Sequence, residues 1–174
     1  MKCLVPNTIQ TERLLLRQIQ QSDETVLLDY LSDPEAVQYT YGNPLDMAGC
    51  RKVITSIEEH WHRRGYGPYA LELKKTNEFL GLVGLSFPEN WPLPELKWAL
   101  IRRYWGKGYA KEAAEAIQIV GSQYLPELDL ISVVHSQNTP SIGLASSLGA
   151  RFEKALSLKE GEVWHVYRHT RVAL

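Results

Sequence analysis

The stretch Trp98-Ala-Leu-Ile-Arg-Arg-Tyr-Trp-Gly-Lys-Gly-Tyr-Ala-Lys-Glu-Ala114 joins an apolar strand pattern to a helix pattern through a glycine-spaced turn. Gly106 and Gly108 lack the Cβ atoms that would restrict a sharp turn or keep another group away from the backbone. The helix after them begins with N–H groups that have no partner inside the helix and carry a partial positive charge. We therefore expect an anion site suited to a pyrophosphate, although a plain strand-to-helix turn would need the same glycines.

The residues around these glycines resemble a cofactor signature. Arg103-x-x-Gly106-x-Gly108, with Tyr109 and Ala110 opening the helix, is similar to the acyl-CoA motif of the GNAT N-acetyltransferases, written Gln/Arg-x-x-Gly-x-Gly/Ala. The longer run from Tyr104 to Ala113 looks like the branch of ribosomal-protein N-terminal acetyltransferases, the RimJ/RimL-like proteins.

A second motif follows about thirty residues later, in the run His135-Ser-Gln-Asn138-Thr-Pro-Ser141. Pro140 suits the first turn of a helix, because its missing N–H would have no partner there. Gly149 suits the end of that helix. The run resembles the GNAT pattern in which Asn-x-x-Ser or Asn-x-x-Ala opens a helix that stops at Leu-Gly. With both motifs in this order, the chain is identified as a member of the GNAT superfamily, and the resemblance covers nearly all of it.

Apolar patterns elsewhere predict alternating strands and helices. The predicted strands cover residues 11–17, 68–74, 79–87, 95–101 and 128–134, with a closing hairpin in 150–169; the predicted helices start at Ser22 or Asp23, at 47, at 110 and at 139. A strand, a crossover helix and a strand predict a parallel pair. Together with the resemblance, this implies an α/β (α+β) protein with the GNAT acyl-CoA N-acyltransferase fold. We expect a mixed central sheet of about seven strands flanked by helices, with splayed parallel strands at the cofactor site.

Composition limits the class of protein. The chain has 174 residues, of which 44% are hydrophobic and 22% charged, so we expect residues 1–174 to form a single acetyltransferase domain. A net charge of −1, from 19 basic and 20 acidic side chains, argues against nucleic acid or an anionic membrane as a partner. Cys3 and Cys50 do not form a disulfide framework or a metal motif, which favours the cytoplasm. We expect no membrane span, and a monomer or a homodimer.

The resemblance implies that acetyl-CoA lies between the strands that end near Ile101 and Val134. The pyrophosphate would take N–H groups from the glycine turn, pantetheine would pair along Leu100, and Asn138 would hold a pantetheine amide. The expected cofactor-binding residues are Leu100, Ile101, Arg103, Trp105, Gly106, Lys107, Gly108, Tyr109, Ala110, Asn138 and Ser141.

The implied reaction is direct attack of a primary amine on the thioester carbonyl. The amine must first lose a proton, since its pKa is about 8 for an α-amino group and about 10.4 for lysine. Glu95, at the start of the cofactor strand, is our candidate base, acting directly or through water; a solvated carboxylate is the plain alternative, and Glu72 is the reserve. The backbone N–H near Leu100 is the expected oxyanion donor by resemblance.

Many GNAT enzymes use a tyrosine as the acid for the thiolate, but the matching position here is Ala145. The related ribosomal-protein branch suggests Ser141 for this role, although serine is also a common helix cap. The acceptor is expected to be a protein N-terminus or a small-molecule amine. The alternative is a GNAT-fold module that binds CoA without catalysis, and the missing tyrosine favours it. A nucleic-acid binder is disfavoured by the balanced charge.

Aromatic residues and histidines supply further candidates. Tyr39, Tyr41 and Tyr30 either line the acceptor pocket or pack in the core, and Trp91 lies in a proline-rich loop that would act as a lid. His60 and His62 fall on different faces of a helix, so we interpret them as solvated side chains. His165 and His169 lie about 13 Å apart along a strand, too far to share a metal ion.

Overall fold

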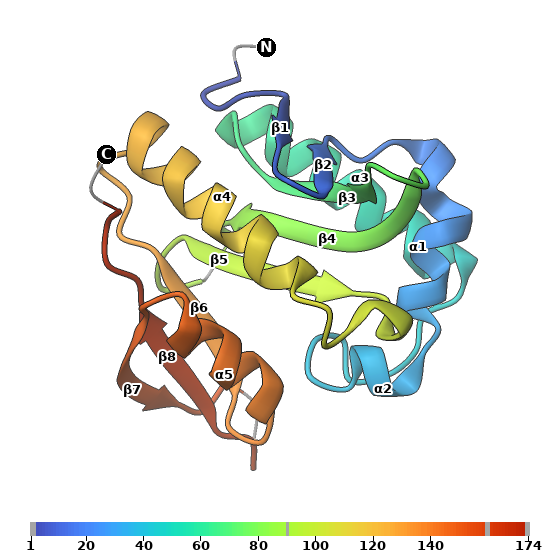
Figure 1. The fold of residues 1–174 in the computed structure, drawn as a ribbon. Coiled ribbons are helices and arrows are strands. Elements are labelled where there is room, and N and C mark those ends of the chain that lie inside the picture. The colour runs from blue at the N-terminus through green and yellow to red at the C-terminus, as the bar shows by residue number, and fades with distance from the viewer. Residues whose placement is uncertain (1–2, 90, 159–160, 173–174) are drawn as a thin grey trace.

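The computed structural model describes residues 3–89, 91–158 and 161–172, and within them the strands form one eight-stranded mixed sheet. The strand order is β1-β2-β3-β4-β5-β6-β8-β7, and the pairs are antiparallel except for β5 with β6 (Figure 1). The strands are β1 (Thr8–Gln10), β2 (Leu14–Arg17), β3 (Pro68–Leu73), β4 (Glu78–Ser86), β5 (Glu95–Leu100), β6 (Ile131–His135), β7 (Arg151–Leu156) and β8 (Trp164–Arg168). The GNAT-type sheet that we expected is thus confirmed, with one more strand than predicted.

The extra strand arises at the N-terminus. The sequence predicted one strand over residues 11–17, whereas the chain forms a hairpin in which the Thr11 N–H donates to the Leu14 carbonyl oxygen at 3.0 Å. The polar residues before Leu14 therefore turn the chain, and β1 pairs back along β2.

The helices follow the predicted pattern closely. They are α1 (Glu24–Leu31), α2 (Pro34–Val37), α3 (Met47–Arg64), α4 (Tyr109–Tyr124) and α5 (Thr139–Ser147), with short 3-10 turns at Gln21–Asp23 and Arg102–Tyr104. Asp46 caps α3 by accepting a hydrogen bond from the Gly49 N–H, and Gly65 ends it in the left-handed conformation. None of the described helices is long and apolar enough to cross a membrane.

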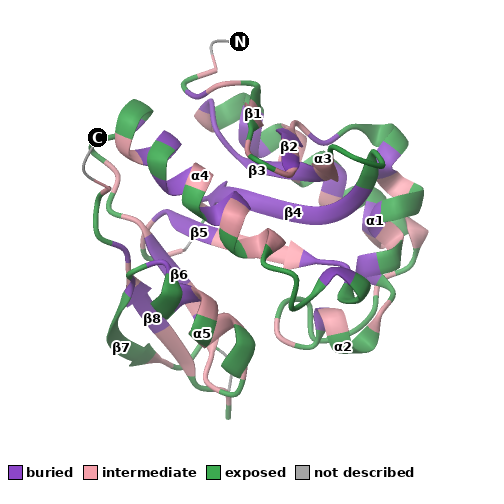
Figure 2. Cartoon of the chain, viewed as in Figure 1, coloured by how far each residue is buried: buried purple, intermediate pink, exposed green. Residues whose placement is uncertain are grey.

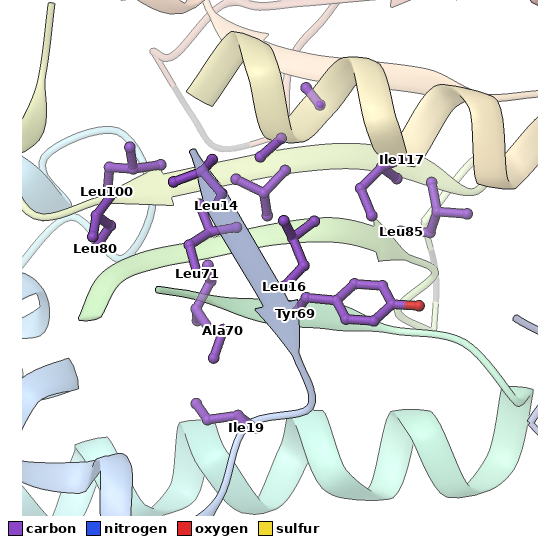
Figure 3. Close-up of a cluster of buried hydrophobic side chains, with 14 of the residues drawn as sticks. Leu14, Leu16, Ile19, Tyr69, Ala70, Leu71, Leu80, Leu85, Leu100 and Ile117 are labelled. Carbon is purple, nitrogen blue, oxygen red and sulfur yellow. The ribbon is translucent and has the colours of Figure 1, made fainter. Parts of the chain in front are cut away.

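The sheet separates two helical layers. Leu14, Leu16 and Leu71 share the face that α4 covers, while α1 and α3 pack on the other face; Figure 3 shows the strands between α4 and α3. Figure 2 shows β4 buried along nearly its whole length, whereas β7 at the sheet edge is exposed. The main core therefore lies around β2 to β5, and β7 and β8 form a thinner outer part of the sheet.

Two glycines of β4 allow close backbone contacts with β5 on one side and with the start of β3 on the other. A glycine inside a strand weakens it unless a close neighbour uses the space left by the missing side chain. A Cβ on Gly81 would lie 2.2 Å from the Ala99 carbonyl oxygen, and a Cβ on Gly84 would lie 2.6 Å from the Gly67 carbonyl oxygen. Both glycines thus serve close backbone contacts, on the strands that lead to the candidate site.

The prediction that His60 is solvated is wrong. His60 is buried; its Nδ1 lies 2.9 Å from the Tyr66 carbonyl oxygen, and its Nε2 accepts a hydrogen bond from the Phe87 N–H at 2.9 Å. These partners lie in the loop after α3 and at the end of β4, and they replace the water that a solvated imidazole would bind. Burial lowers the pKa of His60.

A buried polar chain joins α4 to the β5–β6 junction. The Gln118 amide donates to Nδ1 of His169 at 3.0 Å, His169 Nε2 lies 2.9 Å from the Ser132 hydroxyl, and that hydroxyl donates to the Leu96 carbonyl oxygen at 2.5 Å. Since the serine proton is used by Leu96, His169 Nε2 must donate to Ser132, so the chain needs a neutral imidazole. Burial accordingly lowers the pKa of His169 to about 4.

This arrangement predicts an acid-sensitive stability. The ordinary histidine pKa of 6.5 falls to about 4 in the folded protein, so between these values the unfolded chain binds a proton that the native chain excludes. The free energy of unfolding should therefore fall as pH is lowered from about 6.5 to about 4, by about 3 kcal/mol from this residue. Urea unfolding of the wild type and of His169→Gln across this range would measure it. Parallel pH curves for the two proteins would contradict the assignment.

Candidate active site

The two parallel strands of the sheet separate soon after they meet. β5 pairs with β4 along its whole length, but with β6 the register contains only Glu95 opposite Ile131. From there the backbone of β6 diverges from that of β5, so the strand ends at Leu100 and His135 are separated by a gap between the two strands (Figure 1). The splayed parallel pair that we expected is therefore present, with its vertex at Glu95.

The glycine turn forms an open cradle at one end of this gap. Gly106 and Gly108 adopt φ angles of +71° and +78°, the left-handed region that glycine occupies without strain. Gly108 is the N-cap of α4 and supplies no side chain to satisfy the N–H groups of the first turn. A Cβ on Gly106 would meet no atom within 4 Å, so the turn is open to a ligand. This geometry suits an anion, as the sequence predicted.

Arg13 supports the cradle from the turn just before β2 and was missed by the sequence reasoning. Its guanidinium donates to the Lys107 carbonyl oxygen at 3.0 Å and to the Glu112 carboxylate at 2.6 Å, and it lies 4.5 Å from the centre of the Tyr109 ring. Burial acts against the charge of Glu112, but the hydrogen bonds from Thr11 and Arg13 outweigh it and lower the pKa of Glu112. The first turn of α4 is thus held against β2.

The other predicted residues of this turn occupy varied positions. Arg103 points to α1, where its guanidinium lies 3.1 Å from the Asp29 carboxylate, so the structure does not direct it at the cradle. The Trp105 indole donates to the Leu100 carbonyl oxygen at 2.7 Å, and the Ile101 N–H donates to the Leu80 carbonyl oxygen at 2.9 Å. That Ile101 N–H is therefore not free for a ligand. The Lys107 side chain is exposed, and Ala110 is half-buried in the first turn of α4.

Glu95 is buried at the vertex, with 5% of its surface exposed. Burial raises the pKa of this carboxyl; the Lys97 ammonium, 3.6 Å away, the Trp91 indole and the Val133 backbone offset part of that effect. Burial opposes the charge of Lys97, but Glu95 and Tyr41 outweigh it and raise the pKa of Lys97. A carboxylate in this setting is a stronger base than an exposed one.

Ser141 and Asn138 begin α5 on the far side of the gap. The Ser141 N–H donates to Asn138 Oδ1 at 3.3 Å, so Asn138 is the helix cap. The Trp98 indole donates to the Ser141 hydroxyl oxygen at 3.1 Å and bridges from β5 to α5. Ala145, at the position where the family often has tyrosine, is fully buried. The Ser141 hydroxyl thus lies beside the gap, next to Trp98 of β5.

The alternation of side chains along β5 separates the two catalytic candidates. Glu95 and Lys97 point to the face of the sheet that carries α1 and α3, whereas Trp98 points to the face of α4 and α5. The gap between β5 and β6 therefore has a carboxylate on one side and a hydroxyl on the other.

Of the remaining candidates, Tyr39 and Tyr41 lie near the site, and Tyr30 and Glu72 do not. Tyr39 stacks on His135 with ring centres 4.8 Å apart, and Tyr41 is exposed near Lys97, whereas Tyr30 is buried in the core. Glu72 lies on β3, two strands away from β5, in an ion pair with Arg17 at 2.6 Å. Across the described residues, no group of histidine, cysteine, aspartate and glutamate side chains could hold a metal ion.

Comparison with known proteins assigns the family. Residues 13–151 match the model of the acetyltransferase (GNAT) domain. The chain belongs to the GNAT acetyltransferases. A relative described as an uncharacterized N-acetyltransferase, p20 of Bacillus licheniformis, is 34% identical over 158 residues, which cover 89% of this chain and 87% of p20. Family membership and this relative confirm the prediction of an N-acetyltransferase.

Solved GNAT structures have the same fold. An acetyltransferase from Agrobacterium tumefaciens superposes with a TM-score of 0.83 at 30% identity and covers 95% of each chain. Mycobacterium smegmatis RimJ, in complex with CoA-disulfide, superposes with a TM-score of 0.79 at 18% identity and covers 97% of this chain and 89% of RimJ. At that identity the likeness to RimJ shows the shared fold alone. Structures of the RimJ and RimL type, which the sequence resembles, are thus among the structural neighbours of this chain.

Proposed function

We propose that this protein transfers the acetyl group of acetyl-CoA to a primary amine, either a protein N-terminus or a small molecule, by direct attack. The observation that carries the proposal is the open, uncapped N-terminus of α4 beside the gap between β5 and β6. The cradle has the geometry for a pyrophosphate, and the gap leads from it to a buried carboxylate and a hydroxyl. The CoA held by the related RimJ fold supports CoA as the carrier.

The cofactor would follow the two sides of the gap. The pyrophosphate would accept N–H groups from Trp105 through Ala110, where Gly106 leaves space, and pantetheine would pass along Leu100. Asn138 uses its carbonyl oxygen as the cap of α5, which leaves its NH₂ group to donate to a pantetheine amide. Lys107 would add positive charge at the edge of the cradle.

Glu95 is the proposed base. Its carboxylate is almost inaccessible, so it would take the proton of the amine through one or more water molecules. The raised pKa makes it more basic than an exposed glutamate while Lys97 holds it in the ionised form. The Ile101 N–H is already paired with the Leu80 carbonyl oxygen. The oxyanion donor would therefore be the backbone N–H of Leu100 or of a residue just before it in β5.

Ser141 is the proposed acid for the departing thiolate. An indole N–H can only donate, so the bond from Trp98 makes the Ser141 oxygen an acceptor and leaves the serine proton free for another partner. A donated bond also favours the more negative form of that oxygen. Trp98 would therefore be a positioning residue that keeps the Ser141 proton directed into the gap.

Trp98→Phe should test this role, because it keeps an aromatic ring and removes the N–H. We expect kcat to fall about three- to tenfold with little change in KM, which is the worth of one hydrogen bond. In the Ser141→Ala background the same change should have no further effect. A double-mutant cycle with steady-state kinetics measures this, and equal losses in both backgrounds would contradict the assignment.

A second candidate function is a GNAT-fold module that binds CoA without catalysis, which the buried Ala145 at the tyrosine position favours. An acceptor panel separates the two. Acetyl-CoA is incubated with N-terminal peptides, polyamines, amino acids and antibiotic amines, and free thiol is followed. We expect amine-dependent thiol release; CoA binding by calorimetry with no thiol release with any amine would support the module instead.

We also propose that residues 1–174 act as one domain in the cytoplasm, as a monomer or a homodimer.

A further inference from the structure

A cleft of about 430 Å³ lies beside the gap, away from the glycine cradle. Three segments that are far apart in sequence line it: the loop after α2 at residues 38–42, the turn from β6 into α5 at residues 135–137, and the approach to β8 at residues 161–164. Its volume is in the range of small-molecule sites. The cofactor residues proposed above do not line it, so it is available to another part of the reaction.

One wall of this cleft is aromatic. Tyr39 and His135 stack with ring centres 4.8 Å apart and planes inclined by 24°, and the Trp164 ring meets His135 edge-on at 5.1 Å. Each ring comes from a different segment, so the three hold one another in place. The π-systems of tyrosine and tryptophan rings attract cations, so Tyr39 and Trp164 suit a positively charged group.

Among the aspartate, glutamate, lysine and arginine side chains that the structure describes, only Glu162 lines the cleft. Glu162 lies among the lining residues, and its carboxylate accepts a hydrogen bond from the Trp164 indole at 3.2 Å. No lysine or arginine is among the described residues that line the cleft, and no described basic side chain forms an ion pair with Glu162. A carboxylate next to aromatic faces, with no ion-pair partner among the residues that the structure describes, attracts a positively charged group.

The cleft adjoins the proposed base. Tyr41 belongs to the loop that lines the cleft and interacts electrostatically with Lys97, the ion-pair partner of Glu95. Thr40 fixes this loop through a hydrogen bond with the Tyr30 hydroxyl at 2.8 Å. Along β6, His135 lies four residues beyond Ile131, the partner of Glu95, which corresponds to about 13 Å. An amine at the vertex would therefore leave the rest of its molecule in the cleft.

We infer that this cleft binds a second positive charge on the acceptor, so that the preferred acceptors are dications whose charges lie on the order of 10 Å apart. The inference rests on the proposed function and adds the chemical class of the acceptor. Two sources share this chemistry: a small polyamine, and a peptide with a basic side chain next to its N-terminus. Trp164 and the rings around it would hold the distal cation, and Glu162 would balance its charge.

Matched acceptors test the inference. The first arm compares 1,8-diaminooctane with octylamine, and the second compares peptides that begin Ser-Lys and Ser-Met. In at least one arm, we expect kcat/KM for the doubly charged acceptor to exceed that for the singly charged one by about tenfold or more. The arm in which this ratio is high identifies the acceptor as a small polyamine or as a peptide. Glu162→Gln should bring that ratio close to one, and Trp164→Phe should lower it. Glu127→Gln, an exposed carboxylate beyond the other end of β6, is the matched control and should keep the ratio.

A binding measurement separates this inference from the proposed function. Calorimetry with 1,8-diaminooctane, without acetyl-CoA, should show binding to the wild type that is about tenfold weaker in Glu162→Gln. If the dication binds in this way but no amine is acetylated, the cation site stands and the proposed function fails. If amines are acetylated with equal kcat/KM for both members of each pair, and Glu162→Gln changes nothing, the cation site is overturned and the proposed function stands.

Discussion

Glu95→Gln should lower kcat/KM for an amine acceptor by about 10²–10³-fold, the usual worth of a general base. The substitution keeps the size of the side chain and removes its ability to take a proton. CoA affinity should stay the same, because Glu95 lies at the vertex of the splayed strands and away from the glycine cradle. Steady-state kinetics with an acceptor from the panel measures the first effect, and calorimetry with CoA measures the second.

The pH profile of Glu95→Gln carries the same argument. A base works only when ionised, so kcat/KM of the wild type should rise with pH through the pKa of Glu95, which burial raises above its ordinary value. This rise, the acid limb of the pH profile, should disappear in Glu95→Gln. Lys97 lowers the pKa of Glu95, so Lys97→Met should move the limb to higher pH.

A matched control keeps this test specific. Glu59→Gln changes an exposed carboxylate on α3 and should leave both the rate and the pH profile unchanged. A Glu95→Gln protein that is folded and has the wild-type rate would rule out Glu95 as the base. An unchanged acid limb in that variant would assign the limb to another group.

Gly108→Asp should weaken CoA binding by about 10–100-fold. The new carboxylate would stand at the positive end of α4, where the pyrophosphate is proposed to sit, and two negative charges would compete for the same N–H groups. Aspartate tolerates the left-handed conformation better than most residues, so the fold should persist at φ +78°. A Cβ here lies 3.3 Å from an Arg13 nitrogen, a contact that a small side-chain shift relieves.

Gly108→Asn is the control for that change. Asparagine has the same shape and the same tolerance of positive φ, but it carries no charge. We expect its CoA affinity to lie much closer to that of the wild type, as measured by calorimetry at two salt concentrations. Equal losses in the two variants would mean that space rather than charge governs the turn, and unchanged affinity in both would show that the pyrophosphate binds elsewhere.

Local features of the fold could be predicted from the sequence. Gly106 and Gly108 mark a turn that only glycine adopts easily, and Pro140 with Gly149 bounds α5. Such signals lie within a few residues of the structure that they determine. The cradle could therefore be expected from these residues, whereas the splayed pair was implied by the resemblance to the GNAT family.

Contacts between distant segments could not be predicted in this way. Arg13 supports a turn 94 residues away through the Lys107 carbonyl, and Trp98 donates to Ser141 across the gap. Each pair consists of side chains that are ordinary in their own segments, and only the order of strands brings them together. His60 was misjudged for the same reason, since its partner Phe87 lies 27 residues away.

The single backbone pair between β5 and β6 also affects how the protein unfolds. β6, β7 and β8 have a small apolar cluster of their own, formed by Val134, Ala145, Ala150 and Tyr167, and the half-buried Trp98 packs against both this cluster and the main core. Between the described strands, β5 and β6 share a single register pair, and the other links across the boundary include side-chain bonds such as the chain through Ser132 and the bond from Trp98 to Ser141. The C-terminal strands can therefore open at lower cost than the core. A ligand that fills the gap would supply the missing contacts. If the cofactor binds in this seam, as proposed, its binding would make the two halves of the sheet unfold together.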